Sequence, residues 1–570
     1  MNLSEIARWV LLGGLAIVTY LLVLAWQRDS VAAATALAAA QEASAPASTT
    51  AAGAPSPAVP NANSSPTHSD VPQIPTTPTT APVSGSTGTQ PIVVETDTLR
   101  VLIDPLGGDV VRTELLKYPQ SADDRSKPVV LLTRDATGHV YIAQSGLVGT
   151  NGPDAAVAGR PTYTADKQSY TLQPSASELT VALHYADRAG VRYEKRFTFK
   201  RGQYTIALQQ IVRNQTATIW RGNPYSQLKR DGTEPPSTSS ALGPKPYYGA
   251  AVTTTEEPYA KVHFDDLAET PLAAEEKGGW IAMMQHYFIS AWIGDPASTN
   301  KYFGRKGSDG NFLVGYIGPE LLVQPGATGA TKATLYAGPK VQADLERAAK
   351  NLGLTIDYGI LWPLASLMFQ LMQWLHGHAQ NWGIAIILLT LVVKTILYPL
   401  SAASYRSMAK MREVAPEMRR LQERFADDRQ KLGQEMMAMY KKEKVNPLGG
   451  CLPMLVQMPV FLALYWVLYE SVELRLAPFF LWIKDLAVMD PWFVLPLLMG
   501  VTMYMQQSLN PPMPDPMQAR MMKMMPVVFT VMFLFFPAGL VLYWLTNNVL
   551  SMAQQWWVTR QVEQQSKARA

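Results

Sequence analysis

The chain has 570 residues, of which 48% are hydrophobic, and its net charge is only +4. This small net charge argues against specific nucleic-acid recognition, and the positive charge gathers in one segment rather than over a whole domain. Cys451 is the single cysteine, which excludes an intrachain disulfide and a cysteine-rich metal site. We therefore expect more than one domain and no cofactor.

The first apolar run covers residues 9–26, carries no charge, and has a tryptophan at each end. Interfacial tryptophans at both ends are typical of a membrane-spanning helix. A cleaved signal peptide is the alternative, because small residues follow at 31–40, but its apolar region normally has only about 7–15 residues. We predict an uncleaved transmembrane anchor over residues 1–28.

Residues 29–91 are rich in Ala, Ser, Thr and Pro and have almost no aromatic residues, which predicts a disordered linker. Short β-rich segments then follow, separated by Gly, Pro, Asn and Asp. These segments are residues 99–103, 110–116, 179–185, 192–200 and 204–212. The pattern predicts a large β-sandwich domain over residues 92–340, across the membrane from the basic segment described below. Helical patterning is expected only near its end.

Residues 341–380 contain a predicted amphipathic helix at the membrane surface, over 360–378. Three apolar runs long enough to cross a bilayer follow at 382–400, 449–469 and 492–508. Residues 524–558 are too many for one span, and Pro537 interrupts them, so we predict two crossings. With the N-terminal anchor this makes an α-helical polytopic membrane protein with six transmembrane helices. Both termini, including a tail at 561–570, are then cytoplasmic.

Residues 402–446 form a basic segment, because eleven Lys and Arg lie between positions 406 and 444. Basic loops beside a span stay on the cytoplasmic side. Apolar residues recur at helical spacing on both sides of Asp427 and Asp428, which predicts a helical hairpin. Its methionines are usually core residues, but an exposed methionine-rich surface would suit apolar partners. The candidates for the reception of such partners are Met408, Met411, Met418, Met436 and Met437.

One charge, Lys394, lies inside the run 382–400. A lysine in hydrocarbon costs roughly 2.5–3.5 kcal/mol. Its side chain either snorkels to the cytoplasmic end of the helix or lines a hydrated cavity. Other polar residues in the apolar runs favour a cavity open to the cytoplasm. They are Thr390, Gln457, Thr502, Gln506, Tyr543, Asn547 and Asn548.

No catalytic constellation stands out. The seven histidines are scattered, and His286 is interpreted as an ordinary histidine of the β domain. Paired acids such as Glu256 and Glu257 are interpreted as loop charges, which argues against a carbohydrate enzyme. No phosphate-binding or dinucleotide-binding glycine motif is present. We predict that the chain is not an enzyme.

Several motifs occur in the order found in the YidC membrane protein insertase family, and the chain resembles its long Gram-negative form. They include Tyr398-Pro399-Leu400, Ser407 to Met411, Gln434 to Met437, Lys444 to Cys451, Gln457 to Phe461, Ser471 to Arg475 and Phe536 to Leu540. The resemblance implies a five-helix insertase core over residues 381–560, enclosing a hydrophilic groove. It also implies the bacterial inner membrane and a periplasmic β domain. Lys394 stands where the family has an arginine, and Tyr543 and Trp544 stand where it has two tyrosines.

The resemblance further implies a membrane insertase and chaperone for nascent membrane proteins. Its partners would be the ribosome, the Sec translocon and the lipid bilayer, although it could act without the translocon. The apolar part of the client would slide past Met458, Val460, Phe461 and Val528. The alternative is a solute or ion transporter. Transporters often have inverted internal repeats, and this sequence shows none.

Overall fold

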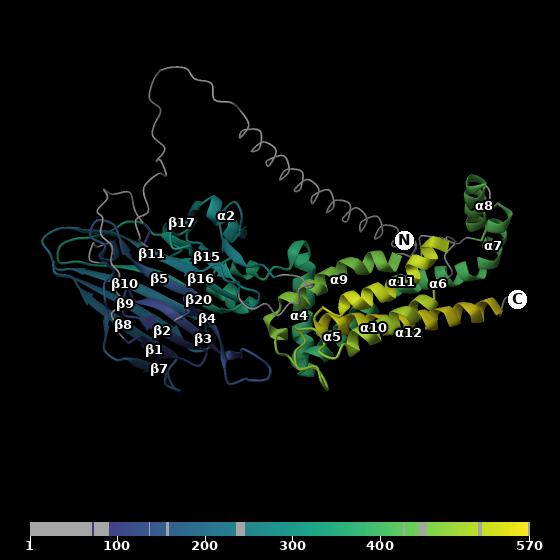
Figure 1. Cartoon of the computed structure of the whole chain (residues 1–570), viewed down its shortest axis with the longest axis horizontal. Helices are drawn as coiled ribbons and strands as arrows, with labels where there is room; N and C mark the ends of the chain where they lie inside the picture. Colours follow the sequence, from purple (N-terminus) through teal and green to yellow (C-terminus); the bar gives the residue numbers. More distant parts are fainter. Residues whose placement is uncertain are drawn as a thin grey trace, which may run out of the picture.

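The computed structural model describes residues 71–72, 90–135, 137–155, 159–234, 246–425, 428–443, 452–510 and 516–567. The predicted anchor at 1–28, most of the predicted linker, and the motif at 444–451 lie outside these residues. Within them the chain forms a β-rich domain followed by a group of helices (Figure 1). The strands predicted at 99–103, 110–116, 179–185, 192–200 and 204–212 are all present, as β2, β3, β8, β9 and β10.

The described part of the β domain contains two sheets. The larger has the order β14-β17-β18-β11-β5-β4-β3-β2-β1-β7, with β19 paired to β11. Its strands are β1 Ile92–Glu95, β2 Leu99–Asp104, β3 Asp109–Pro119, β4 Pro128–Arg134, β5 Val140–Val148, β7 Ser169–Thr171, β11 Trp220–Arg230, β14 Leu272–Lys277, β17 Thr299–Lys306, β18 Phe312–Ile317 and β19 Leu321–Val323.

The smaller sheet has the order β13-β12-β15-β16-β20-β10-β9-β8-β6. Its strands are β6 Thr164–Ala165, β8 Glu178–Ala186, β9 Val191–Lys200, β10 Thr205–Asn214, β12 Gly249–Val252, β13 Ala260–Val262, β15 Trp280–Met284, β16 Phe288–Gly294 and β20 Thr328–Pro339. Every residue of β15 and β16 is buried, so both faces of these strands are covered.

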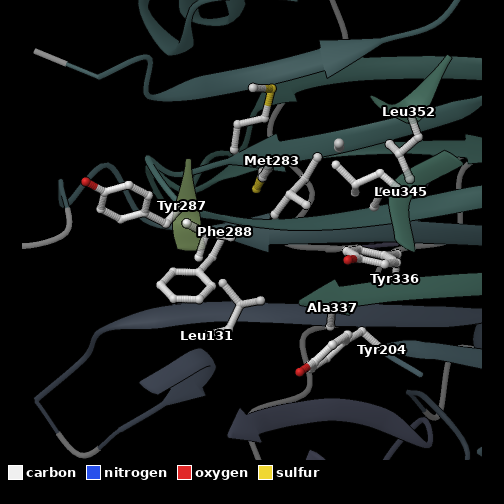
Figure 2. Packing of buried hydrophobic residues seen from close by; sticks show 14 of the residues in the cluster. Leu131, Tyr204, Met283, Tyr287, Phe288, Tyr336, Ala337, Leu345 and Leu352 are labelled. Carbon is white, nitrogen blue, oxygen red and sulfur yellow. The ribbon is translucent and has the colours of Figure 1, made fainter. Parts of the chain in front are cut away.

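The two sheets pack face to face through apolar side chains. Figure 2 shows Leu131 of the larger sheet beside Phe288 of the smaller one. Leu345, from helix α3 (Gln342–Ala348), is fully buried near Tyr336. A second helix, α2 (Phe264–Glu269), was not expected inside the domain. It has only six residues, too few for a helical period to be read from the sequence.

The remaining helices lie beyond the β domain (Figure 1). Their bounds are α4 Trp362–Ala379, α5 Trp382–Ile396, α6 Tyr398–Glu413, α7 Ala415–Arg424, α8 Arg429–Lys442, α9 Leu452–Glu470, α10 Val494–Ser508, α11 Pro516–Phe533 and α12 Ala538–Lys567. Helix α4 crosses the ends of α5 and α9 nearest the β domain, whereas α7 and α8 lie at the opposite end (Figure 1). Helix α12 continues through most of the predicted tail.

The amphipathic helix predicted at 360–378 is α4. Its buried face is formed by Ala365, Met368, Phe369, Met372 and Leu375. Three large apolar side chains of α4 are instead exposed, namely Leu367 (62%), Trp362 (58%) and Trp374 (61%). The helix therefore presents apolar side chains on two sides, one against the protein and one outward.

Among the residues that the structure describes, no single helix is both long enough and apolar enough to cross a membrane by itself. Helices α5 and α6 taken together are long and apolar enough, but the pair bends by 67° at the junction.

The predicted uninterrupted helix at 382–400 is wrong at its C-terminal end. Helix α5 stops at Ile396, and α6 starts at Tyr398 with Pro399 in its first turn. Proline has no backbone N–H, and its ring would clash with the carbonyl group of Thr395 in a continuous helix, so it starts a new helix instead. The helical structure of the basic segment consequently begins before residue 402. Another proline, Pro416, lies in the first turn of α7 and separates it from α6.

The break predicted near Pro537 is present. Helix α11 ends at Phe533, and α12 begins at Ala538. The N–H groups of Ala538 and Gly539 donate to the carbonyl oxygens of Val488 and Leu486, at 2.7 and 2.9 Å. These bonds satisfy two backbone donors at the start of α12, which would otherwise lack partners.

The β domain contacts the last residues of α9 and the segment that follows them. The ring Nε2 of His286 donates to the carbonyl oxygen of Tyr469 at 3.0 Å, which assigns the proton to that nitrogen. Burial, assisted by Lys340, lowers the pKa of His286 to about 3, so the ring is neutral. The guanidinium of Arg475 donates to the carbonyl oxygens of Pro119 and Gln120, at 2.7 and 2.9 Å. The domain is therefore fixed to the helical part by directional bonds as well as by the linking chain.

Candidate client-binding site

Lys394 lies in the last turn of α5, and only 5% of it is exposed. Its Nζ donates to Ser551 Oγ of α12 at 2.7 Å and to Gln457 Oε1 of α9 at 3.2 Å. A snorkelling lysine extends its head group into solvent, whereas this head group is held between two neighbouring helices. The geometry therefore favours the inward-facing interpretation of Lys394.

The partners of Lys394 are connected to each other through Asn547. Gln457 accepts from Lys394 with its oxygen and donates to Asn547 Oδ1 with its nitrogen. Ser551 donates to the backbone carbonyl of Asn547 at 2.6 Å. Each hydrogen bond in this series joins a donor to an acceptor, so the arrangement is consistent with a charged lysine. We call Lys394, Gln457, Asn547 and Ser551 the polar cluster.

The other predicted cavity residues lie close to the polar cluster but bond differently. Asn548 Nδ2 donates to Thr502 Oγ1 at 3.5 Å, which connects α12 to α10. Thr390 is 1% exposed and donates to the carbonyl group of Ile386 in its own helix at 2.7 Å. Gln506 is half-buried, one turn after Thr502. The amide nitrogen of Gln507 instead donates to the carbonyl group of Met522 in α11.

Aromatic rings border the polar cluster. The ring of Phe461 lies 4.4 Å from that of Trp544 in an edge-on contact and 6.3 Å from that of Tyr543 in a stacked one. Tyr543 is 1% exposed. Such contacts combine burial of large apolar rings with favourable ring geometry. Phe461, which we expected on the client's sliding surface, therefore packs inward.

The other three predicted sliding residues differ in exposure. Met458 of α9 and Val528 of α11 are 46% and 59% exposed, whereas Val460 is half-buried and packs against the main core. Exposed apolar residues also line α10 and α11. They include Leu497, Leu498, Val501, Met521, Met524, Val527 and Val531. The outer surface of these two helices is thus apolar.

The five predicted reception methionines lie in different surroundings. Met418 is buried in a small core with Met439 and Tyr440, and Met411 and Met436 pack against that core. Met408 packs beside Tyr405 and Val558, on α6 and α12. Met437 is the exposed member of the five, at 56%. The described helices α7 and α8 are therefore held together by the residue type that we considered for client contact.

Ser551 is the residue of the polar cluster that the sequence analysis missed. It lies four positions after Asn547, so both residues occupy one face of α12. This spacing was the available signal. Gln554, three residues further on, donates to the backbone carbonyl of Lys394 at 3.4 Å.

Two family models match the chain. One, described as the 60Kd inner membrane protein, matches residues 374–566, and the other, described as the YidC periplasmic domain, matches residues 91–371. The chain is 48% identical to the membrane protein insertase YidC of Pseudomonas fluorescens and to that of Pseudomonas putida, over 99% of this chain and 100% of each relative. The chain belongs to the YidC family. The family resemblance derived from sequence motifs is thus confirmed.

The YidC insertase of Azotobacter vinelandii is 49% identical, over 98% of this chain and 99% of the relative. A solved structure titled as an active YidC insertase with its first transmembrane domain resolved covers 82% of this chain and 92% of that chain, with 20% identity and a TM-score of 0.36. The YidC family is a family of bacterial inner-membrane insertases, and this member has the family's periplasmic β-rich domain.

Proposed function

We propose that this YidC-family protein inserts nascent membrane proteins into the bacterial inner membrane and assists their folding. Relatives that are close to half identical over the full length carry the name membrane protein insertase, which supports the insertase activity. The observation that carries the mechanism is the position of Lys394, a buried cation bonded to side chains of two other helices.

The proposed topology has six membrane spans with both termini in the cytoplasm. After the N-terminal anchor, the spans are built from α5, α9, α10, α11 and α12, with the β domain in the periplasm. The positions of α7 and α8, at the end opposite the β domain, support a cytoplasmic location for the basic segment (Figure 1).

In the proposed mechanism, the short hydrophilic end of a client enters between the helices from the cytoplasm. Acidic groups of the client replace Ser551 and Gln457 as partners of Lys394, and water hydrates the remaining polar side chains. The client's apolar segment leaves along the exposed surface that includes Met458 and Val528. Its transfer into lipid, at roughly 25 cal/mol per Å² of apolar surface, drives release. The inward-facing polar side chains thereby shorten the distance that the hydrophilic end must cross without partners.

The insertase activity is tested with the full chain reconstituted into liposomes without the Sec translocon. We expect a client with one apolar segment and a short hydrophilic end to become protected from protease, without added ATP. Liposomes without the protein provide the control. Solute flux without client insertion would instead favour the transporter alternative.

The basic hairpin is proposed to receive clients, or the ribosome that delivers them. Its buried core of Met418, Met439 and Tyr440 is separate from the main core. Deletion of residues 411–443 should therefore leave the rest folded, with an unchanged gel-filtration profile, and lower insertion from ribosome-bound clients at least several-fold. Replacing these residues by a Gly/Ser linker of equal length controls for chain length. If the deletion variant were stably folded and inserted clients as well as the parent, the proposed reception role would be wrong.

A further inference from the structure

A cleft of about 350 Å³ lies at the end of the helices opposite the β domain, starting one turn of α12 beyond Ser551 of the polar cluster. It is bordered by α6, by the residue after α10 and by the last turns of α12. The lining residues are Arg412, Leu509, Gln555, Trp556, Thr559, Arg560 and Glu563. None of the functions proposed above uses this cleft.

Two arginines give the cleft a positive charge. Arg412 is half-buried, and the Arg560 guanidinium lies over the ring of Trp556, 5.3 Å from its centre. Among the described residues, neither guanidinium forms an ion pair with a carboxylate. Glu563 is the one acidic lining residue, so the lining has a net charge of +1 (two Arg minus one Glu). The two unpaired guanidinium groups offer hydrogen-bond donors suited to an anion such as phosphate.

The walls of the cleft are held in place by Gln555. Only 4% of Gln555 is exposed, and its Nε2 donates to the carbonyl oxygen of Leu509 at 3.1 Å and to Asn510 Oδ1 at 3.3 Å. These bonds attach α12 to the end of α10. The cleft is therefore present before any ligand binds, which lowers the ordering cost of binding.

The position of the cleft along α12 matches the headgroup layer of a bilayer. From Ala538 to Arg560, α12 rises roughly 33 Å at 1.5 Å per residue, close to the ~30 Å thickness of the hydrocarbon layer. Trp556 and Trp557 are 55% and 56% exposed, as expected for tryptophans at an interface. Val549, seven residues before Trp556 and on the same face, is 46% exposed. This face of α12 is thus apolar before the cleft and charged at it.

We propose that the cleft binds the phosphate of an anionic phospholipid from the cytoplasmic leaflet. Arg412 and Arg560 hold the phosphate, and the acyl chains lie along the apolar face that includes Val549. A headgroup with one negative charge neutralises the net charge of the lining, whereas a zwitterionic headgroup leaves it unbalanced. The inference rests on the proposed membrane orientation and adds a lipid ligand to it.

The test is native mass spectrometry of the full-length protein released from detergent, titrated with phosphatidylglycerol or phosphatidylcholine. We expect the parent protein to retain phosphatidylglycerol in preference to phosphatidylcholine. The R412Q/R560Q variant should bind phosphatidylglycerol at least tenfold more weakly, because two charge-assisted contacts are lost. The matched control is R419Q/R420Q, which removes two exposed arginines of α7 and should bind like the parent. Arg560→Gln alone, at an exposed position, serves if the double variant is unstable.

If phosphatidylglycerol binding were weakened equally in R412Q/R560Q and R419Q/R420Q, the lipid would be attracted to basic residues in general. That result would overturn the proposal. Equal retention of the two lipids, or displacement of the lipid by soluble glycerol phosphate at similar concentrations, would also overturn it. Displacement by a short RNA with the same dependence on the two arginines would assign the cleft to a nucleic acid instead. Client insertion by the parent protein, measured separately, distinguishes failure of this proposal from failure of the insertase assignment.

Discussion

Replacing Lys394 by methionine should lower the insertion of clients with acidic translocated ends by about tenfold or more. Methionine keeps most of the aliphatic stem but removes the cation that Gln457 and Ser551 hold in place. A hydrogen bond involving a charged group is worth about 1.5–3 kcal/mol, which corresponds to this reduction. Lys394→Arg should retain most activity because the charge remains, and Lys394→Glu should be the most impaired. The measurement is protease protection of the client at equal expression of each variant.

Clients with neutral translocated ends provide the matched control for these variants. Their insertion should fall much less, since Asn547 and Gln457 still offer polar contacts. If the Lys394 side chain only snorkelled to the cytoplasmic end of its helix, replacing it would remove the cost of desolvating the charge. The insertion of both client classes would then be unaffected. Equal insertion of acidic clients by the methionine variant and the parent would contradict the proposed role of the charge.

A second large effect is expected where the β domain meets the end of α9. Lys340 Nζ and Glu470 Oε2 are 2.8 Å apart, and the two side chains are only 3% and 5% exposed. Lys340 also donates to the carbonyl group of Thr355 at 3.4 Å. Lys340→Met should destabilise this interface by about 3–5 kcal/mol, because it leaves a buried carboxylate without its cation. Hydrogen exchange of the backbone amides at 471–477 reports this loss locally.

The double variant Lys340→Met with Glu470→Met distinguishes the ion pair from general packing. Two apolar side chains can replace a buried pair at little net cost. The double variant should therefore exchange more slowly than Lys340→Met alone, close to the parent. The single variant Glu470→Met completes the comparison. If the increases in exchange rate of the two single variants simply added up in the double variant, the assigned pairing would be contradicted.

The β domain was largely predictable because its strands alternate between less exposed and more exposed residues, as in β2 and β8. Such a period of two can be read from a short segment. The interruption between α5 and α6 was missed although Pro399 was visible in the sequence. The length of the apolar run 382–400 suggested one continuous span, but the missing N–H of Pro399 ends α5 and starts α6. Contacts between distant segments, such as that between Lys340 and Glu470, leave no local pattern to read.

Lys394 and most of its polar surroundings were predictable from the sequence because charged and amide side chains are costly inside apolar runs. Ser551 was not, because its small hydroxyl group is common in helices and is satisfied within its own helix. The sequence also left two roles open for the methionines of the basic segment. Met418 packs in a core and Met437 is exposed, and only the packing of α7 against α8 separates them.

The most direct test of the proposed insertion route is photo-crosslinking from position 394 to stalled nascent membrane proteins. A crosslinking amino acid is placed at 394, and others at 458 and 528. A matched control is placed at Lys484, whose side chain is 71% exposed in the loop between α9 and α10. We predict that 394 labels the hydrophilic end of the client, that 458 and 528 label its apolar segment, and that 484 labels neither. Labelling from 458 and 528 without any from 394 would contradict passage of the client beside Lys394.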